Sequence, residues 1–208
     1  MRTSLGAWST SDAASLAAAV RASPDLAVQL GADAPGTVDE ARAFIAQHLA
    51  PLDASRFAFA VRVDGVAVGS VALSNVDRRH DTAWVSYWVA TSHRGRGLAS
   101  RALASAAQLG LDDLGLARLE LGHRVNNPAS CRVATAAGFV AEGVERAKLR
   151  YGSERFDVET HARLATDPAP SIDLVPVDRT SLLGRPLRDE AGWVTGRTIA
   201  SDGGSSSR

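Results

Sequence analysis

Two glycines and two arginines give the sequence its densest chemical signal. They lie in residues 93–99, between an apolar segment and a long stretch rich in leucine and alanine. The start of a helix exposes unpaired N–H groups and the positive end of the helix dipole. Gly95 and Gly97 lack a Cβ atom, so an anion can approach the main chain closely, and Arg94 and Arg96 add positive charge. The segment predicts a phosphate or pyrophosphate site. The same residues also fit an ordinary glycine-containing loop with solvated arginines.

This segment departs from the two best-known phosphate-binding motifs. No Lys-Ser or Lys-Thr pair follows Gly97, so the segment is not a P-loop. The third glycine of the dinucleotide-binding fingerprint is absent, and that fingerprint is expected near the start of its domain. The anion site therefore needs support from other residues.

A second polar segment begins a short helix further along the chain. Asn127 precedes Pro128, a residue favoured in the first turn of a helix, and Ser130 follows. Asn127 fits a helix N-cap, and Ser130 fits the hydrogen bonding of a first turn. Either side chain could instead contact a ligand, and Asn127 could do both.

The composition argues against several classes of function. Among 208 residues, 23 Lys and Arg balance 23 Asp and Glu, so no nucleic acid partner is expected. Cys131 is the only cysteine, which argues against a disulfide and a cysteine-based zinc site. His48, His80, His93 and His161 lack the spacing typical of metal ligands, so no metal is predicted. No apolar run approaches the roughly 20 residues of a membrane span, and the N-terminal residues lack a secretory pattern. We therefore expect a cytoplasmic protein.

The hydrophobic pattern predicts an α/β domain that positions both polar segments. The expected helices cover residues 10–22, 37–49, 97–113 and 128–137, with Pro24 ending the first. The expected strands flank a turn at Asp64-Gly65 and cover residues 82–90, 117–125, 139–147 and 154–164. Each polar segment thus follows a strand and starts a helix.

Motifs in these segments resemble one known family. The pattern Arg94-x-x-Gly97-x-Ala99 is similar to the Arg/Gln-x-x-Gly-x-Gly/Ala motif of the GNAT superfamily of acyl-CoA-dependent N-acetyltransferases. A second block is similar to a run in the subgroup that acetylates ribosomal-protein N-termini and assorted small amines. This block consists of Asn127-Pro128-Ala129-Ser130, Ala137-Gly138-Phe139 and Glu142-Gly143. The resemblance covers about residues 5–164 with the order intact.

The resemblance implies a GNAT fold, a mixed central sheet flanked by helices with one parallel strand pair that splays apart. Strands 82–90 and 117–125 would be that pair, with the pantetheine arm of the cosubstrate acetyl-CoA in the gap. The implied cofactor-binding residues are Trp88, Val89 and Ala90 on the strand, Arg94, Gly95, Arg96, Gly97, Leu98 and Ala99 in the loop, and Asn127 with Ser130.

The resemblance also implies how the reaction proceeds. The amine attacks the thioester directly, so no enzyme nucleophile is needed and proximity carries much of the rate. Backbone N–H groups near Val89 would stabilise the developing oxyanion. Many relatives protonate the departing thiolate with a tyrosine, but the matching position is Ala134. Ser130 is therefore the candidate general acid.

The general base is less clearly indicated. The subgroup often carries a glutamate in the strand before the loop, and Trp84 stands at that position. Glu120 is the candidate base, with His123 on the opposite side of the sheet as another. Glu120 could instead hold an arginine, and a chain of water molecules could serve as the base.

The function predicted from these features is acetyl-CoA-dependent N-acetylation of a primary amine. The acceptor would be a peptide N-terminus, a lysine or a small molecule, bound by residues 24–50 and the 147–155 loop. The missing strand glutamate and helix tyrosine leave a catalytically silent acyl-CoA-binding or regulatory module as the alternative. Neither a membrane nor nucleic acid is an expected partner, and a homodimer stays open.

The character of the sequence changes after Leu164. Half of the eight prolines lie in the last 44 residues, and the end is rich in glycine and serine. We therefore expect the GNAT domain over residues 1–164 and an extension of unknown role over 165–208. The extension could be disordered, could form a hairpin between Leu182 and Ile199 over the acceptor site, or could be an arm exchanged in a dimer.

Overall fold

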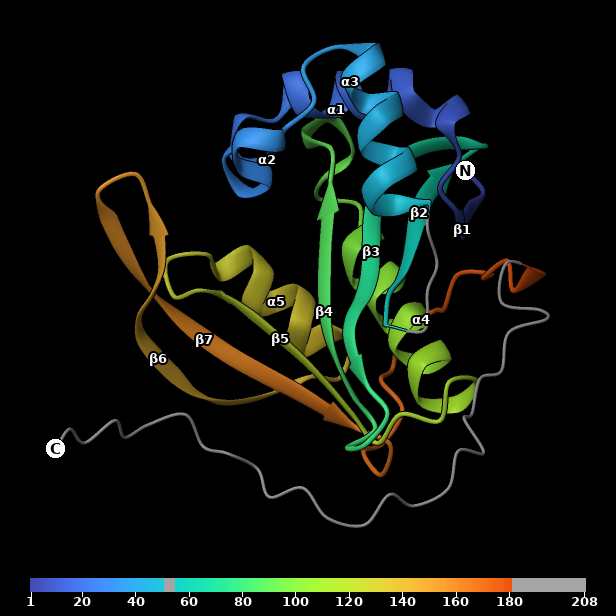
Figure 1. The fold of residues 1–208 in the computed structure, drawn as a ribbon. Helices are drawn as coiled ribbons and strands as arrows, with labels where there is room; N and C mark the ends of the chain where they lie inside the picture. Colours follow the sequence, from blue (N-terminus) through green and yellow to red (C-terminus); the bar gives the residue numbers. More distant parts are fainter. Residues whose placement is uncertain (51–54, 181–208) are drawn as a thin grey trace, which may run out of the picture.

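The computed structural model describes residues 1–50 and 55–180 and has a mixed sheet at its centre (Figure 1). The strands are β1 (Thr3–Ala7), β2 (Phe57–Val63), β3 (Val66–Asp77), β4 (Thr82–Val89), β5 (Arg118–Arg124), β6 (Val140–Tyr151) and β7 (Glu154–Leu164). They form one sheet in the order β1-β2-β3-β4-β5-β7-β6. Neighbouring strands are antiparallel except β4 and β5, which are parallel.

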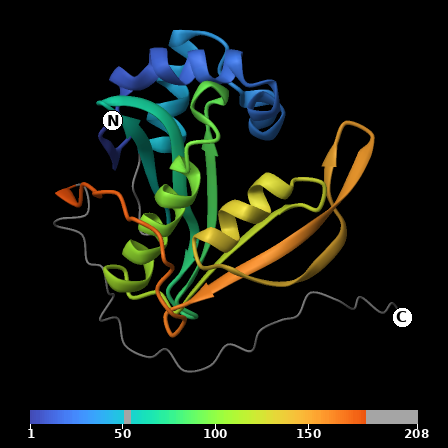
Figure 2. The same ribbon diagram turned by 180° about the vertical axis from the view of Figure 1, so that it is seen from behind.

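Helices cover both faces of this sheet. They are α1 (Ala13–Ala22), α2 (Pro24–Leu30), α3 (Val38–Phe44), α4 (Leu98–Asp112) and α5 (Pro128–Ala136). Helices α1 and α3 pack on one face, while α4 and α5 pack on the other, as the view from behind shows (Figure 2). Within the described part of the chain, none of the helices has the length and apolar character needed to cross a bilayer.

The side chains of β2 show why two separate cores form. Phe57, Phe59 and Val61 pack into the core on the α4 side, whereas Ala58 and Ala60 pack against α1 and α3. Successive side chains of a strand point to opposite faces, so this alternation assigns the large residues to one face and the small residues to the other. The small alanines let α1 and α3 approach the sheet closely.

The predicted mixed α/β fold is confirmed, and two elements were not expected from the sequence. Strand β1 pairs with β2 at the edge of the sheet. Helix α2 begins at Pro24, which was expected only to end the preceding helix. Proline fits the first helical position because its fixed φ is already helical and the N–H it lacks would have no partner there. Pro24 therefore separates two helices.

The parallel pair opens into a wedge. Strands β4 and β5 are paired only from Thr82 to Trp84 on β4 and from Arg118 to Glu120 on β5. Beyond these residues the strands diverge, and α5 lies beside the opening (Figure 1). The splayed parallel pair expected from the sequence is thus present, and it leaves one backbone edge of β4 open.

The first part of the C-terminal extension packs on the domain. The N–H of Leu5 donates to the Pro176 carbonyl, and the N–H of Asp178 donates to the Leu5 carbonyl, both at 2.8 Å. Val175 is buried, and its N–H donates to Ser105 Oγ on α4 at 2.8 Å. This segment covers the otherwise open edge of β1, which would be prone to pair with another chain. The hairpin expected between residues 182 and 199 lies outside the described residues.

A half-buried ion pair joins the N-terminal segment to β2 and gives a first stability prediction. Arg62 donates to both carboxylate oxygens of Asp12, at 2.7 and 2.8 Å. We expect Asp12→Asn to lower the free energy of unfolding by about 2 kcal/mol, because it breaks charge-assisted bonds shielded from water. Asp39→Asn is the control, since its pair with Arg42 is exposed and contributes about 0.5 kcal/mol. Equal losses in urea denaturation of the two variants would contradict the prediction.

Candidate active site

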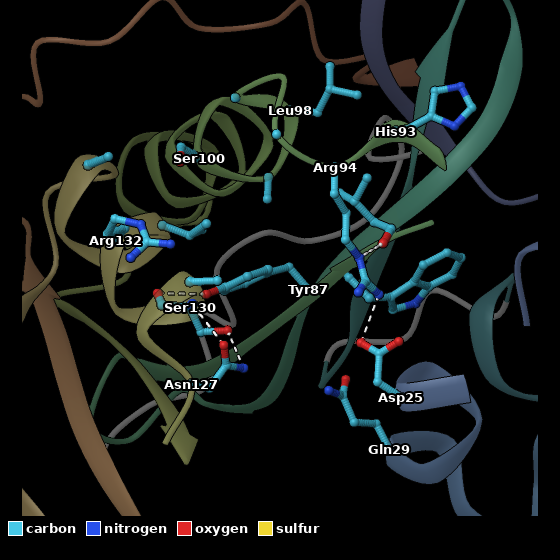
Figure 3. Close-up of a pocket in the computed structure, with 18 residues that line it drawn as sticks. Asp25, Gln29, Tyr87, His93, Arg94, Leu98, Ser100, Asn127, Ser130 and Arg132 are labelled. Carbon is cyan, nitrogen blue, oxygen red and sulfur yellow. Dashed lines mark hydrogen bonds and ion pairs between the residues drawn. The ribbon is translucent and has the colours of Figure 1, made fainter. Parts of the chain in front are cut away.

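A cavity of about 530 Å³ fills the wedge between β4 and α5 (Figure 3). Its volume lies in the range of small-molecule sites. Three sequence segments far apart in the chain line it, together with α2. The lining residues are Asp25, Gln29, Tyr87, Trp88, Val89, His93, Arg94, Gly95, Gly97, Leu98, Ala99, Ser100, Asn127, Ala129, Ser130, Arg132, Val133 and Ala136.

One wall of the cavity is the open backbone edge of β4. The N–H of Ala90 donates to the Val68 carbonyl on the β3 side at 2.8 Å. Hydrogen bonds alternate along an antiparallel pair, so the N–H and carbonyl of Val89 point the other way, toward the gap. The wedge thus offers the Val89 N–H to a ligand, while its carbonyl accepts from Arg94 Nε at 2.9 Å.

At one end of the cavity lies the glycine loop that precedes α4. Gly95 and Gly97 have φ angles of +75° and +72°, a region that favours glycine. The first hydrogen bond of the helix runs from the Arg101 N–H to the Gly97 carbonyl. The N–H groups of Leu98, Ala99 and Ser100 come before this bond and have no acceptor within the helix. These groups are free to bind an anion, together with the positive end of the helix dipole.

Arg94 connects this loop to α2. Its guanidinium pairs with Asp25 at 2.8 Å and donates to the Val89 carbonyl. Figure 3 shows Arg94 and Asp25 on one side of the cavity, opposite Asn127 and Ser130. Arg94 therefore fixes the loop against β4 as well as adding positive charge to the cavity wall.

At the start of α5 the two predicted polar residues form one unit. Asn127 Oδ1 accepts from the Ser130 N–H at 3.2 Å, which makes Asn127 the N-cap. Asn127 Nδ2 donates to Ser130 Oγ at 3.0 Å. Because Ser130 Oγ accepts this bond, its own O–H stays available as a donor into the cavity.

Tyr87 is a cavity residue that the sequence did not single out. Its hydroxyl donates to the Ser130 main-chain carbonyl at 3.2 Å. Burial raises the pKa of Tyr87, so the hydroxyl stays protonated and holds α5 against β4. The alternation of β4 could have indicated its direction, because Tyr87 and Val89 share a face.

Nine of the eleven expected cofactor-binding residues line the cavity. The other two, Ala90 and Arg96, are not among its lining residues. The N–H of Ala90 is engaged by β3, and Arg96 is exposed and donates to the Ser92 carbonyl. Arg132, which was not among the predicted cofactor-binding residues, also lines the cavity.

Glu120 lies where β4 and β5 are still paired and does not line the cavity. Its carboxylate accepts from Arg118 Nε at 2.8 Å, and Arg118 also pairs with Glu142. This arginine holds the pKa of the Glu142 carboxyl below its usual range. The structure therefore places Glu120 in the arginine-holding role that the sequence left open.

A smaller cavity of about 100 Å³ adjoins the other side of Trp88, which lines both spaces. Leu30, Phe44 and Leu49 contribute to it from the 24–50 region expected to bind the acceptor. Arg56 also lines it, and its Nε is buried with no hydrogen-bond partner among the described residues. This orphaned donor suits a ligand with a carbonyl or carboxylate oxygen.

The fold and this cavity define the class of protein, and the sequence comparison identifies the family. Residues 2–140 match the Acetyltransferase (GNAT) domain, and the chain belongs to this family. It is 30% identical over 97 residues to a ribosomal-protein-serine acetyltransferase from Escherichia coli strain K12, covering 47% of this chain and 54% of that protein. The chain spans about half the length of the curated relatives it matches.

Solved structures agree with the family. The chain is similar to Mycobacterium smegmatis RimJ in complex with CoA-disulfide, with a TM-score of 0.67 and 26% identity, covering 76% of this chain and 80% of that one. A spermidine N-acetyltransferase from Vibrio cholerae has the same fold, with a TM-score of 0.66 and 20% identity, covering 79% and 95%. The GNAT fold is therefore confirmed.

Proposed function

We propose that this protein is an N-acetyltransferase that moves an acetyl group from acetyl-CoA to a primary amine. The observation that carries the proposal is the cavity itself. It joins a helix start with free N–H groups to a serine hydroxyl, along an open strand edge. The similarity to a RimJ structure in complex with CoA-disulfide supports the choice of cosubstrate.

The loop end of the cavity suits the pyrophosphate. The N–H groups of residues 98–100 and the helix dipole favour negative charge, and Gly97 leaves the main chain accessible. Arg132 lines the same cavity from α5 and adds a second cationic group. A diphosphate placed here would point its pantetheine arm along β4 toward Ser130.

The β4 edge suits the pantetheine arm and the thioester. Amide groups of the arm can continue the hydrogen bonding of β4 in place of the diverging β5. The N–H of Val89 would polarise the thioester carbonyl and stabilise negative charge on its oxygen. Asn127 retains one N–H beyond its bond to Ser130, which can also contact the arm.

Acetyl-CoA supplies the activated acyl group, and the chain's own residues assist its transfer. As the amine forms its bond to the acyl carbon and the C–S bond breaks, Ser130 donates its hydroxyl proton to the departing thiolate and regains a proton from water. The Asn127 bond orients Oγ for this role. Among the described residues that line the two cavities, the only carboxylate is Asp25, which pairs with Arg94. We therefore propose that the amine loses its proton to water.

The acceptor we propose is a peptide N-terminus. In the smaller cavity, Arg56 Nε has no hydrogen-bond partner among the described residues and matches a peptide carbonyl, and none of the described lining residues is acidic. A polyamine would bring further ammonium groups close to the Arg56 guanidinium, and the described lining of this cavity offers no carboxylate to pair with them. The E. coli relative is a ribosomal-protein-serine acetyltransferase, which fits the same choice.

Release of free thiol from acetyl-CoA, measured across peptides, lysine derivatives and spermidine, tests this function. We expect turnover with peptide N-termini and little with spermidine. Tight binding of coenzyme A without turnover on any amine would favour the silent module instead. Faster turnover with spermidine than with any peptide would overturn the proposed acceptor, while the proposed N-acetyltransferase activity would stand.

A further inference from the structure

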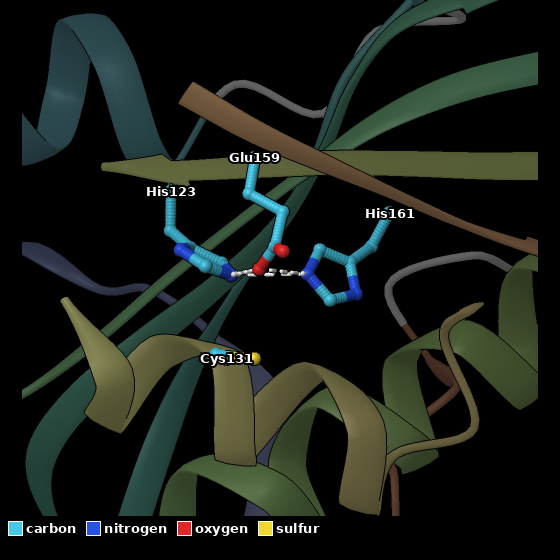
Figure 4. Close-up of side chains that lie close together, drawn as sticks. All are labelled: His123, Cys131, Glu159 and His161. Carbon is cyan, nitrogen blue, oxygen red and sulfur yellow. Dashed lines mark hydrogen bonds and ion pairs between the residues drawn. The ribbon is translucent and has the colours of Figure 1, made fainter. Parts of the chain in front are cut away.

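Four side chains with metal-ligating atoms meet between α5 and the sheet, outside the cavity (Figure 4). His123 comes from β5, Glu159 and His161 come from β7, and Cys131 comes from α5. Their donor atoms all lie within 4.8 Å of one another. We propose that these four residues bind one zinc ion. This inference does not depend on the proposed function.

The distances in the cluster match the space that zinc needs. The Nε2 atoms of His123 and His161 are 3.0 Å apart, and Glu159 Oε2 lies 3.3 and 3.1 Å from them. The centre of such a triangle is roughly 1.8 Å from each corner, so an ion with bonds of about 2.0 Å sits roughly 1 Å above its plane. Cys131 Sγ becomes the fourth ligand of a tetrahedron when it moves a short distance toward the ion.

The imidazole of His123 is oriented as in a zinc ligand. Its Nδ1 lies 3.1 Å from the Arg124 carbonyl, which can only accept, so Nδ1 carries the proton. With the proton on Nδ1, Nε2 can present its lone pair to the cluster. In many metal sites, a backbone carbonyl accepts a hydrogen bond from the histidine nitrogen that does not bind the metal, and this bond fixes the orientation of the ring.

The polar contacts of the other ligands also converge on this point. Nδ1 of His161 is buried without a hydrogen-bond partner among the described residues, and the ring contacts His123 and Glu159 through Nε2. A carboxylate, two imidazoles and a thiol thus face one point, a donor set that suits a divalent cation.

The donor set and the burial point to a structural zinc site. Two imidazoles, one thiolate and one carboxylate suit zinc, which accepts all three ligand types. The side chains of His161 and His123 are only 1% and 5% exposed, while Glu159 is 31% exposed and leaves a path for entry. Four protein ligands leave no open position for substrate. The ion would fix Cys131, and hence its neighbour Ser130, to β5 and β7.

Zinc binding to the purified full chain tests the proposal. After treatment with a chelator, the apoprotein is titrated with ZnCl₂ in competition with a chromophoric chelator. We expect one zinc ion per chain and a higher melting temperature, since an ion that binds the folded state stabilises it. His161→Gln should weaken binding by about 100-fold or more, whereas His80→Ala, which changes an exposed histidine, should not.

Cobalt(II) provides a second measurement that does not require the histidine variant to fold. The wild-type chain with CoCl₂ should show a thiolate-to-cobalt absorption band, and Cys131→Ser should lose that band while keeping its fold by circular dichroism. A hydrogen-bonded histidine core is the competing arrangement. Binding of zinc by the wild type no tighter than by His161→Gln, or cobalt spectra unchanged in Cys131→Ser, would overturn the proposal.

Discussion

Gly97→Val should reduce the affinity for coenzyme A by about 100-fold or more. Gly97 has a φ of +72°, and a non-glycine residue there costs about 1–2 kcal/mol, more for a β-branched one. No atom lies within 4 Å of a Cβ built on Gly97, so the packing of the chain does not require glycine. The new side chain would occupy space that a phosphate needs beside the start of α4.

Isothermal titration with coenzyme A measures this effect. The matched control is Gly65→Val in the turn between β2 and β3, where φ is +88° and a Cβ also meets no atom within 4 Å. Both variants should lose similar stability, but the Gly65 variant should keep its affinity. If the Gly97 variant binds coenzyme A about as tightly as the wild type, the pyrophosphate does not bind at this loop.

Ser130→Ala should lower kcat by about 100-fold, the usual contribution of a positioned general acid. The substitution removes the one side-chain hydroxyl that the start of α5 presents to the cavity, so the thiolate would leave without its proton donor. The main-chain bond from the Ser130 N–H to Asn127 remains, so the helix start is preserved. Only the bond from Asn127 Nδ2 to Oγ is lost, at about 1 kcal/mol.

Steady-state thiol release with a peptide acceptor, alongside thermal denaturation, separates catalysis from helix capping. KM for acetyl-CoA should change little, and Ser130→Thr should recover part of kcat because it keeps a hydroxyl. Ser11→Ala, which removes an exposed hydroxyl in the N-terminal segment, should leave kcat unchanged. If kcat of Ser130→Ala equals that of the wild type, Ser130 only stabilises the start of α5.

Much of the cavity could be predicted from the sequence because its parts are local motifs. A glycine loop at the start of a helix and an Asn-Pro-x-Ser segment each specify their backbone within a few residues. The predicted cap at Asn127 is confirmed. The catalytic and binding roles of these residues stay predictions.

Contacts between distant segments could not be read from the sequence. Tyr87 reaches Ser130 across 43 positions, and Asp25 reaches Arg94 across 69, so spacing along the chain carries no signal of either. Strand β1 was missed because five residues at a sheet edge are defined by their partner, β2, more than by their own pattern. The extension up to residue 180 was likewise placed by its contacts with Leu5 and α4.

The sequence by itself determined the family, the order of the central strands and helices, and the glycine loop, since hydrophobic period and turn chemistry act over short distances. Only the tertiary structure decided that Glu120 holds an arginine outside the cavity, and that His123, Cys131, Glu159 and His161 meet. Pairing of β5 with β7 and packing of α5 bring those four together. The physical reason is that such proximity arises from strand register and helix packing, which depend on the whole folded chain.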